Sequence, residues 1–386
     1  MGGGSRTAVP AAVEVTRRSS FALLRTVARR SSLRAALVGC GGIGAVRAAA
    51  IARSPEVTLA VACDVDGGRA GALAGRYGAT LETDWRAAVA RDDVLVIVST
   101  TPDLHAPVAI AAAQAGKHVL CEKPMARTVE ECRAMVAAAE RHGVKLKIGF
   151  NHRHYLSVMA IKAAIDAGTI GEVRFVRAAI GHEGGPGFAE HWVTKHAITG
   201  GGTLVDNGIH VLDLARYLLE SQGGRIEEAQ GYVLNARWPV APNEDNAFCL
   251  FRAGGEDGGP ERVAQVTSSW TEWKGYRWFV EAYGTRGYVH AAYSPMRAVI
   301  GTVGEGGGRA KKRALTFPVF QVRERLRGHD WTTAETFRRE FADLAAAIHD
   351  DRAPCADGHD GLRAQAMAEA VYRAARERRA VALSEV

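Results

Sequence analysis

The stretch that decides the fold is RAALVGCGGIGAVRAAAIARS, residues 34–54. An apolar run of strand composition ends in glycines, and a segment of helical composition follows directly. The turn between them contains G-x-G-x-x-G as Gly39, Gly41 and Gly44. The first glycine permits a tight turn, the second lets the backbone approach a pyrophosphate, and the third lets the helix pack closely on the strand. We therefore expect a dinucleotide site in this turn, at the N-terminus of the helix.

The next apolar run, VTLAVACD at residues 57–64, ends in an acidic residue at the position that a dinucleotide site requires. Asp64 stands about 20 positions after Gly44. A carboxylate there binds the ribose hydroxyls and repels a 2′-phosphate, so we expect NAD as the cofactor and NADP as the less favoured one. Arg69 nearby weakens that preference. The alternative is an ordinary glycine turn of an α/β protein.

Three further apolar runs, at residues 94–100, 118–123 and 144–150, are separated by alanine-rich segments of helical composition. Continuous apolar strands between helices are typical of a parallel sheet covered on both faces. We therefore expect a doubly wound Rossmann domain over residues 33–150, with its ligand beyond the carboxyl ends of the strands. The other cofactor-binding candidates in the turn and at these ends are Gly42, Ile43, Thr100, Thr101, Pro102, His105, Glu122 and Lys123.

The composition and the hydrophobic pattern of the sequence change after residue 150. A segment of helical composition ends at Gly168 and is followed by short β-rich runs between Gly, Asn and Pro, which favour an antiparallel sheet. The last stretch is helical again, and we expect it to pack back on the first domain. The predicted fold class is α/β followed by α+β, with a second domain over residues 151–386.

The basic charge is local. The chain has 49 basic and 42 acidic residues, a net charge of +7, and much of the excess lies in the first 34 residues. A nucleic-acid surface would place basic and aromatic side chains along one element, so we expect no nucleic-acid partner. The six cysteines show no close ligand spacing, which favours neither a zinc site nor a disulfide framework.

The N-terminal segment contains TRRSSFALLRTVARR, residues 16–30, an arginine pair before a short apolar patch. Arg25 interrupts that patch, whereas an export signal needs an unbroken apolar region of about 7–15 residues. An organelle transit peptide is an alternative, and we favour a disordered extension over residues 1–32. Since no apolar run approaches the ~20 residues that span a bilayer, we expect a cytoplasmic protein with no membrane partner.

A second motif, GGGTLVDNGIHVLD at residues 200–213, carries candidate catalytic groups. In a helix, Asp206 and His210 lie one turn apart on the same face and can interact. Hydride removal from a carbinol carbon leaves an oxygen that must lose its proton, and a histidine with a pKa near neutrality suits this step. We expect the glycines at 200–202 to be backbone that passes close to substrate or nicotinamide. The alternative is a helix-start carboxylate and a core histidine.

Lys123 completes the candidate catalytic set. The EKP sequence places it at the carboxyl end of a predicted strand, immediately before Pro124. The bond to that proline is a candidate for the cis form. A lysine in the crevice can donate to the same oxygen as charge develops on it. The alternative is a solvated surface lysine.

The motifs GCGGIG, TPDLH, CEKPM, GFNHR and GGGTLVDNGIHVLD, in this order, resemble the glucose-fructose oxidoreductase / inositol dehydrogenase family, often written Gfo/Idh/MocA, over residues 33–385. The resemblance implies a second domain with a large open antiparallel sheet, often used for oligomerisation, and hence a dimer or tetramer. It implies reversible NAD(P)-dependent oxidation of a secondary alcohol of a sugar, polyol or cyclitol. The family's catalytic lysine, aspartate and histidine correspond to Lys123, Asp206 and His210.

Substrate contacts are expected from these three residues and from two further segments. The family often has Asn-Arg-Arg after the sixth strand; Asn151 and Arg153 fit this pattern, while His152 replaces one arginine. A sugar ring suits an aromatic face and several hydrogen-bonding groups. The pocket candidates before the glycine run are His182, His191, Trp192, Lys195 and His196.

These histidines lack the ligand spacing of zinc sites, so we expect no metal. Two other functions remain open. One is an NAD-dependent glycosidase that acts through an oxidised intermediate without net cofactor turnover. The other is a cofactor-binding regulator without catalysis.

Overall fold

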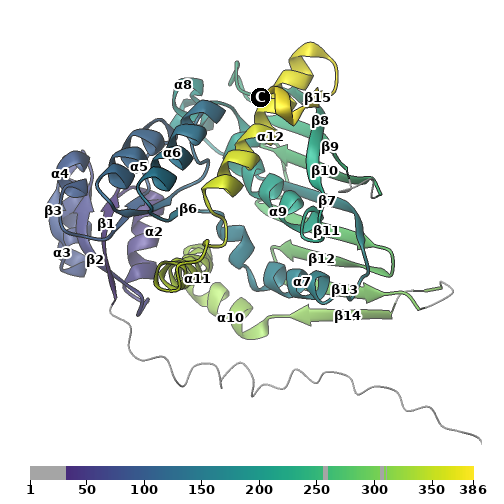
Figure 1. Cartoon of the computed structure of the whole chain (residues 1–386), viewed down its shortest axis with the longest axis horizontal. Helices are drawn as coiled ribbons and strands as arrows, with labels where there is room; N and C mark the ends of the chain where they lie inside the picture. The colour runs from purple at the N-terminus through teal and green to yellow at the C-terminus, as the bar shows by residue number, and fades with distance from the viewer. Residues whose placement is uncertain (1–31, 255–259, 305–307, 310) are drawn as a thin grey trace, which may run out of the picture. The chain divides into compact units, whose positions relative to one another are not determined.

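The first sheet forms from the apolar runs that the sequence predicts as strands. Its six strands are all parallel and lie in the order β3-β2-β1-β4-β5-β6. Figure 1 draws this part of the chain in purple and blue. The order reverses between β1 and β4, which is where a doubly wound sheet opens a crevice. The strands are β1 (Leu33–Val38), β2 (Val57–Cys63), β3 (Thr80–Glu82), β4 (Leu95–Val98), β5 (His118–Cys121) and β6 (Leu146–Ile148).

The computed structural model describes residues 32–254, 260–304, 308–309 and 311–386. The expected N-terminal extension, apart from its last residue, therefore lies outside the described residues. Of the first sheet, the sequence reading missed only β3, whose three residues form no apolar run.

The helices of the first layer begin at recognisable caps. Asp66 accepts from two backbone N–H groups at the start of α3, and Thr128 accepts from one at the start of α6. The helix after the glycine turn, α2, begins at Gly41 without a side-chain cap, which leaves its first N–H groups for a ligand. These helices are α2 (Gly42–Ile51), α3 (Gly67–Tyr77), α4 (Trp85–Val89), α5 (His105–Gln114) and α6 (Val129–Arg141).

The second sheet has nine strands in the order β14-β13-β12-β11-β7-β10-β9-β8-β15. All neighbouring pairs are antiparallel except β7 and β10, which run parallel. The expected mostly antiparallel sheet is confirmed. Its strands are β7 (Val173–Gly181), β8 (Arg225–Leu234), β9 (Asn246–Gly254), β10 (Arg262–Ser269), β11 (Arg277–Gly284), β12 (Gly287–Tyr293), β13 (Arg297–Thr302), β14 (Lys311–Thr316) and β15 (Val381–Ala382).

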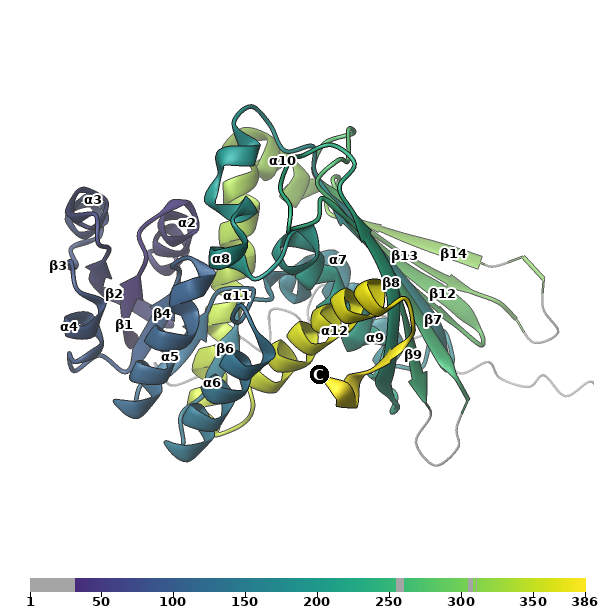
Figure 2. The same cartoon turned by 90° about the horizontal axis from the view of Figure 1, so that it is seen from above.

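Helices cover one face of the second sheet. Burial alternates along its strands, and the described residues place helices only on the buried side (Figure 2). Side chains on the other face include the exposed Tyr232, Leu234, Phe248 and Leu250. The helices of this part are α7 (Leu156–Asp166), α8 (His196–Thr199), α9 (Ile209–Leu219), α10 (Pro318–Arg327), α11 (His329–His349) and α12 (Gly358–Glu377).

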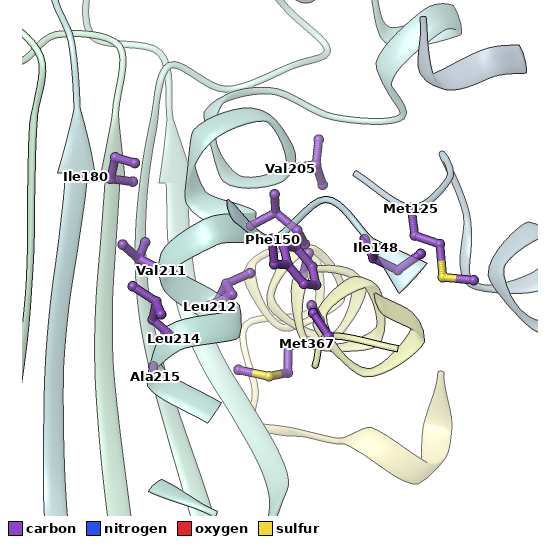
Figure 3. Close-up of a cluster of buried hydrophobic side chains, with 14 of the residues drawn as sticks. Met125, Ile148, Phe150, Ile180, Val205, Val211, Leu212, Leu214, Ala215 and Met367 are labelled. Carbon is purple, nitrogen blue, oxygen red and sulfur yellow. The ribbon is translucent and has the colours of Figure 1, made fainter. Parts of the chain in front are cut away.

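The last long helices return to the first sheet. α11 packs on α2, and its Phe337, Phe341 and Leu344 belong to the same buried cluster as Leu37 and Leu59 of the parallel sheet (Figure 1). α12 packs on α6 and on β8. Between the sheets lies a continuous apolar core, in which Figure 3 shows Met125, Ile148, Phe150, Val205 and Met367. The core therefore fixes the end of β5 against the start of α9.

No helix in the described part of the chain is long and apolar enough to cross a membrane. All six cysteines are described and free, and five of them are buried.

Candidate active site

A cavity of about 1090 Å³ opens at the carboxyl edge of the first sheet. The glycine turn and Asp64 line it on the side of β1 and β2, and Lys123 lines it beyond β5. Asp206 and the segment 182–199 contribute side chains from the second part of the chain. The cavity is therefore built by both halves, at the crevice predicted from the strand pattern.

The glycines of the turn divide into two kinds. Gly39 has φ +97°, and a Cβ there would collide with the carbonyl oxygen of Ser99. A Cβ on Gly44 would collide with the carbonyl oxygen of Gly39. At Gly41 and Gly42, which line the cavity, a Cβ would meet nothing within 4 Å. Packing therefore requires glycine at positions 39 and 44. At positions 41 and 42 the missing side chains leave space beside the uncapped start of α2, and this space fits a pyrophosphate.

Asp64 is fixed at the end of β2. Its Oδ2 accepts from the Cys40 N–H at 2.8 Å, and its Oδ1 accepts from the Asp66 N–H at 2.9 Å and from Arg69 Nη2 at 3.1 Å. The carboxylate lines the cavity, as ribose binding requires. Arg69 also lines the cavity. Its positive charge therefore lies beside the Asp64 carboxylate, the group that would repel the 2′-phosphate of NADP.

The remaining cofactor candidates also line the cavity, with one exception. Ile43, Thr100, Thr101, Pro102 and Glu122 all contribute to its wall.

The exception is His105, which is buried and not part of the cavity wall. Its Nδ1 lies 2.8 Å from the Pro124 carbonyl oxygen and its Nε2 lies 3.1 Å from that of Thr100. Burial lowers the pKa of this histidine. His105 therefore joins the loop after β4 to the loop after β5, and its contact with the cofactor stays a prediction.

Lys123 and Asp206 meet across the cavity. Lys123 Nζ donates to Asp206 Oδ1 at 3.1 Å and to the Asp206 carbonyl oxygen at 2.9 Å. The two side chains are 20% and 18% exposed, so the ion pair is largely removed from water. Trp270 Nε1 donates to Asp206 Oδ2 at 3.3 Å, and the Lys123–Pro124 bond is cis. Lys123 is therefore a cavity lysine and not a solvated surface lysine.

The expected pairing of Asp206 with His210 is not observed. The segment Leu204–Gly208 forms a π-helical turn before α9. In the described residues, Asp206 bonds to Lys123 and Trp270 and not to His210.

His210 is 6% exposed and is not among the side chains that line the cavity. Its ring packs against His152 and Phe150. Burial, then His152 and Lys123, lower its pKa well below the ordinary value of 6.5. The expectation of a pKa near neutrality is thus corrected, because the site is drier and more cationic than the sequence indicates.

The segment before the glycine run contributes aromatic and imidazole groups. His182, His191 and Trp192 line the cavity, together with Phe188, which the sequence reading missed. His182 Nδ1 accepts from the Gly184 N–H at 2.9 Å, which fixes the ring at the wall.

Two of the predicted pocket residues lie elsewhere. Lys195 Nζ donates to the Ala189 carbonyl oxygen at 2.9 Å, and His196 Nδ1 lies 2.7 Å from Asn243 Oδ1. Neither is among the residues that line the cavity. Both side chains instead bond to their own segment or to the neighbouring loop.

Asn151 and Arg153 bond to other protein groups and do not line the cavity. Asn151 Nδ2 donates to Thr336 Oγ1 at 3.0 Å. Arg153 is buried and bonds to Asp213 at 2.7 Å and to Asp360 at 2.9 Å. These groups therefore bond to α9, α11 and α12 in this structure, and their contact with substrate stays a prediction.

Packing, and not a close approach to substrate or nicotinamide, explains the three glycines at 200–202. A Cβ on Gly200 would collide with the Arg127 carbonyl, one on Gly201 with the Tyr372 hydroxyl, and one on Gly202 with the Glu244 carbonyl. None of the three lines the cavity. They let this segment pack against the loop before α6, the helix α12 and the loop before β9.

A buried charge network stands behind Glu122 and was missed from the sequence. Arg47 Nε donates to Glu122 Oε1 at 2.6 Å, and Arg47 Nη1 donates to Glu340 Oε2 at 3.1 Å. Arg47 lies in the otherwise apolar helix GIGAVRAAAI, and a lone charge on such a helix is a signal of a buried ion pair. Trp270 carried no comparable signal.

The side chains around the cavity decide which groups the site can hold. Among the described residues, no cluster of three or more His, Cys, Asp or Glu side chains could hold a metal ion. The open glycine turn, the uncapped helix start and the Asp64 carboxylate fit a dinucleotide instead.

Comparison with known proteins agrees with this arrangement. The family model described as "Oxidoreductase family, NAD-binding Rossmann fold" matches residues 33–150, and that of the GFO/IDH/MocA C-terminal domain matches residues 158–290. The chain is 28% identical to an inositol 2-dehydrogenase of Rhizobium meliloti over 353 residues, which are 92% of this chain and 100% of that protein.

Two further similarities extend this result. The chain is 30% identical to an inositol 2-dehydrogenase of Rubrobacter xylanophilus over 260 residues, 66% of this chain and 69% of that protein. Its structure is similar to that of a levoglucosan dehydrogenase in complex with NADH and levoglucosan, with a TM-score of 0.79 and 26% identity, over 91% of this chain and 99% of that chain.

Proposed function

This chain belongs to the Gfo/Idh/MocA oxidoreductase family, and we propose that it reversibly oxidises a secondary alcohol of a sugar, polyol or cyclitol. Its cofactor is NAD, which accepts the hydride when bound. Relatives named for inositol and levoglucosan act on polyhydroxylated rings, which supports this substrate class. In the proposed division of labour, residues 33–150 bind the cofactor and residues 151–386 bind the substrate.

The contact between Lys123 and Asp206 carries the proposal. It places an ammonium group that is largely shielded from solvent in the cavity, beyond the strand ends where the cofactor binds. Lys123 donates to the substrate oxygen and stabilises the negative charge that develops as the hydride leaves. Asp206 holds the ammonium in place through its carboxylate and its carbonyl oxygen.

His210 is the proposed general base. The lowered pKa leaves its imidazole neutral, as a base that accepts the proton of the substrate hydroxyl must be, but makes it a weaker base than a histidine with a pKa near neutrality. Its ring does not line the cavity in this structure, and catalytic hydrogen bonds often form only once substrate is bound.

The wall formed by Phe188, Trp192, His182 and His191 is the proposed substrate surface. Aromatic faces pack on the C–H face of a sugar ring, and imidazole nitrogens bond its hydroxyls. These side chains are therefore expected to set the KM.

We also propose a homo-oligomer that uses the open face of the second sheet. Tyr232, Leu234, Phe248 and Leu250 are 69%, 44%, 46% and 50% exposed on two adjacent strands. A contiguous apolar surface of this kind marks an interaction site.

The decisive experiment measures NADH formation from NAD by the purified protein, over a panel of sugars, sugar derivatives and cyclitols. His210→Ala and Lys195→Ala serve as the paired controls, since the Lys195 ammonium bonds to Ala189 and does not line the cavity. A substrate oxidised by the native protein and by Lys195→Ala, but at least about 100-fold more slowly by His210→Ala, is the expected result. Absence of NADH with every alcohol, despite bound cofactor, would contradict the dehydrogenase proposal.

A further inference from the structure

Two of the histidines that line the cavity hold their rings in the same way. His182 Nδ1 accepts from the Gly184 N–H at 2.9 Å. His191 Nδ1 accepts from the Val193 N–H at 3.3 Å, again two residues further along the chain. A ring nitrogen that accepts an N–H carries no proton itself, so each imidazole is neutral and has its proton on Nε2. Both rings are therefore fixed as the same tautomer.

The backbone of each histidine is anchored as well. The His182 N–H donates to the Ser269 carbonyl oxygen at 3.1 Å, and its ring meets that of Phe188 edge-on at 5.5 Å. The His191 N–H donates to the Phe188 carbonyl oxygen at 3.1 Å, and its side chain caps the short helix Trp192–Thr194. Neither ring can turn Nδ1 into the cavity without breaking the bond to its own segment. The Nε2–H edge is the one left for a ligand.

The other polar side chains at this end of the cavity are also chiefly donors. The Lys123 ammonium and the Trp192 indole have no acceptor at all. The Thr199 hydroxyl donates to two carbonyl oxygens of its own segment. The Asp206 carboxylate is an acceptor, but it is already bonded to Lys123 and Trp270. A substrate therefore meets a wall of hydrogen-bond donors.

This wall carries little net charge. Lys123 and Asp206 form an ion pair, so their charges offset each other. Burial lowers the pKa of His182, although Asp206 and Glu183 raise it, which agrees with a neutral ring. Neither a cation nor an anion is attracted by charge alone, and the direction of the hydrogen bonds decides which group fits.

We propose that His182 and His191 select the substrate by the group that faces them, binding a hydroxyl or ether oxygen and excluding a protonated amino group. The inference rests on the proposed function and narrows its substrate class to rings that present oxygen, and no amino group, to these two imidazoles. An oxygen accepts from Nε2–H, whereas an ammonium group has three N–H donors and no lone pair. Opposite a fixed donor, the ammonium group loses its bonds to water and gains none.

The test compares analogues of the ring alcohol that the native protein oxidises best. Myo-inositol and levoglucosan, for which relatives are named, are tried first. Each hydroxyl that is not oxidised is replaced in turn by an amino group or by hydrogen. At the position that faces the histidines, the amino group should lower kcat/KM at least about 10-fold more than hydrogen does, since hydrogen loses one bond while the ammonium group adds unpaired donors. Equal kcat/KM for amino and deoxy analogues at every position would overturn the inference.

Glutamine variants separate this selection from a general loss of activity. Glutamine has an amide oxygen that accepts as well as an NH2 that donates. In His182→Gln or His191→Gln, the ratio of kcat/KM for the parent alcohol to that for the amino analogue should therefore fall about 10-fold, even where both rates fall.

His196→Gln is the matched control. Its ring lies in the same segment, but its Nδ1 is 2.7 Å from Asn243 Oδ1 and it does not line the cavity. The ratio should keep its native value in this variant. An equal fall in His196→Gln, or no fall in either cavity variant, would contradict the proposal.

Ring ¹⁵N NMR of histidine-labelled protein separates this inference from the proposed function, because it needs no turnover. Each signal is assigned by its loss in the matching glutamine variant. At about pH 8, His182 and His191 are expected to have a bare Nδ1 and a protonated Nε2. If no alcohol is oxidised while both tautomers are as expected, the dehydrogenase proposal fails and the donor assignment stands. If an alcohol is oxidised while the proton lies on Nδ1 in either ring, the inference fails.

Discussion

Arg47 on α2 and Glu340 on α11 form an ion pair of 3.1 Å in which both side chains are fully buried. Glu122 competes for the same guanidinium at 2.6 Å. One arginine thus faces two carboxylates, and burial raises the pKa of Glu340 to about 7 even though Arg47 and Lys147 lower it. The network lies directly behind the loop that carries Lys123.

This raised pKa predicts a pH dependence of stability. Between about pH 4.5 and pH 7 the folded carboxyl keeps a proton that the unfolded one has released, so stability falls as the pH rises through this window. Glu340→Gln should flatten the change by at most about 1.4 kcal/mol per pH unit. Urea unfolding at several pH values measures it, with Glu130→Gln on exposed α6 as the control. An unchanged slope in Glu340→Gln would refute the assignment.

Asp64→Ala should weaken NAD binding by about 10- to 150-fold and narrow the advantage of NAD over NADP. The carboxylate lines the cavity and is the group placed to bond the ribose hydroxyls, and a hydrogen bond to a charged group contributes about 1.5–3 kcal/mol. Dissociation constants for both cofactors, measured by fluorescence titration, check this. A variant that keeps the native ratio of the two constants would show that Asp64 does not set the preference.

Lys123→Ala should lower kcat by at least about 100-fold, since a donor aimed at developing charge is removed. The fold should persist, because Lys123 is partly exposed and its two hydrogen bonds both go to Asp206. Steady-state kinetics and thermal unfolding are measured together. Near-native turnover in Lys123→Ala would remove the lysine from the mechanism.

Gly201→Ala should destabilise the protein by about 1–3 kcal/mol, because the new methyl group collides with the Tyr372 hydroxyl. Adding Tyr372→Phe removes the colliding oxygen and should return part of that loss. Gly75→Ala on α3 is the control, since its Cβ would meet nothing within 4 Å and a helical alanine is favoured over glycine. Chemical denaturation of the single and double variants gives the coupling. If the stability losses of the two single variants simply add in the double variant, the new methyl group does not collide with the Tyr372 hydroxyl.

Phe248→Glu should shift the protein to a smaller species, because it puts a charge into the open apolar face of the second sheet. Light scattering after size exclusion measures the mass. Val322→Glu is the control: that valine is 58% exposed but lies on α10, away from this face. An unchanged mass in Phe248→Glu would move the interface elsewhere.

The fold was largely predictable because its signals are local. The glycine turn, the spacing to Asp64 and the apolar strands each follow from neighbouring residues. The short β3 was missed, since its pairing with β2 depends on the sheet and not on its own composition.

The sequence predicted a site residue correctly only where the residue's position along its own strand or helix decides where its side chain points. Lys123 reaches the cavity because a strand ends there. The pairing of Asp206 with His210 is not seen because Asp206 bonds to Lys123 and Trp270, which lie far away in the chain. Arg153 bonds to Asp213 and Asp360, which lie far away in the chain and are brought near only by folding.

The contact of α11 with α2 has a consequence for how the protein is made. The strands of the parallel sheet leave the ribosome first, but Phe337, Phe341 and Glu340, which complete their core and neutralise Arg47, are synthesised after all the strands of the second sheet except the short β15. Until then Arg47 lacks one of its two carboxylates and part of the apolar surface on α2 stays uncovered. The cofactor-binding half therefore reaches its final stability only near the end of translation, when nearly the whole chain has emerged.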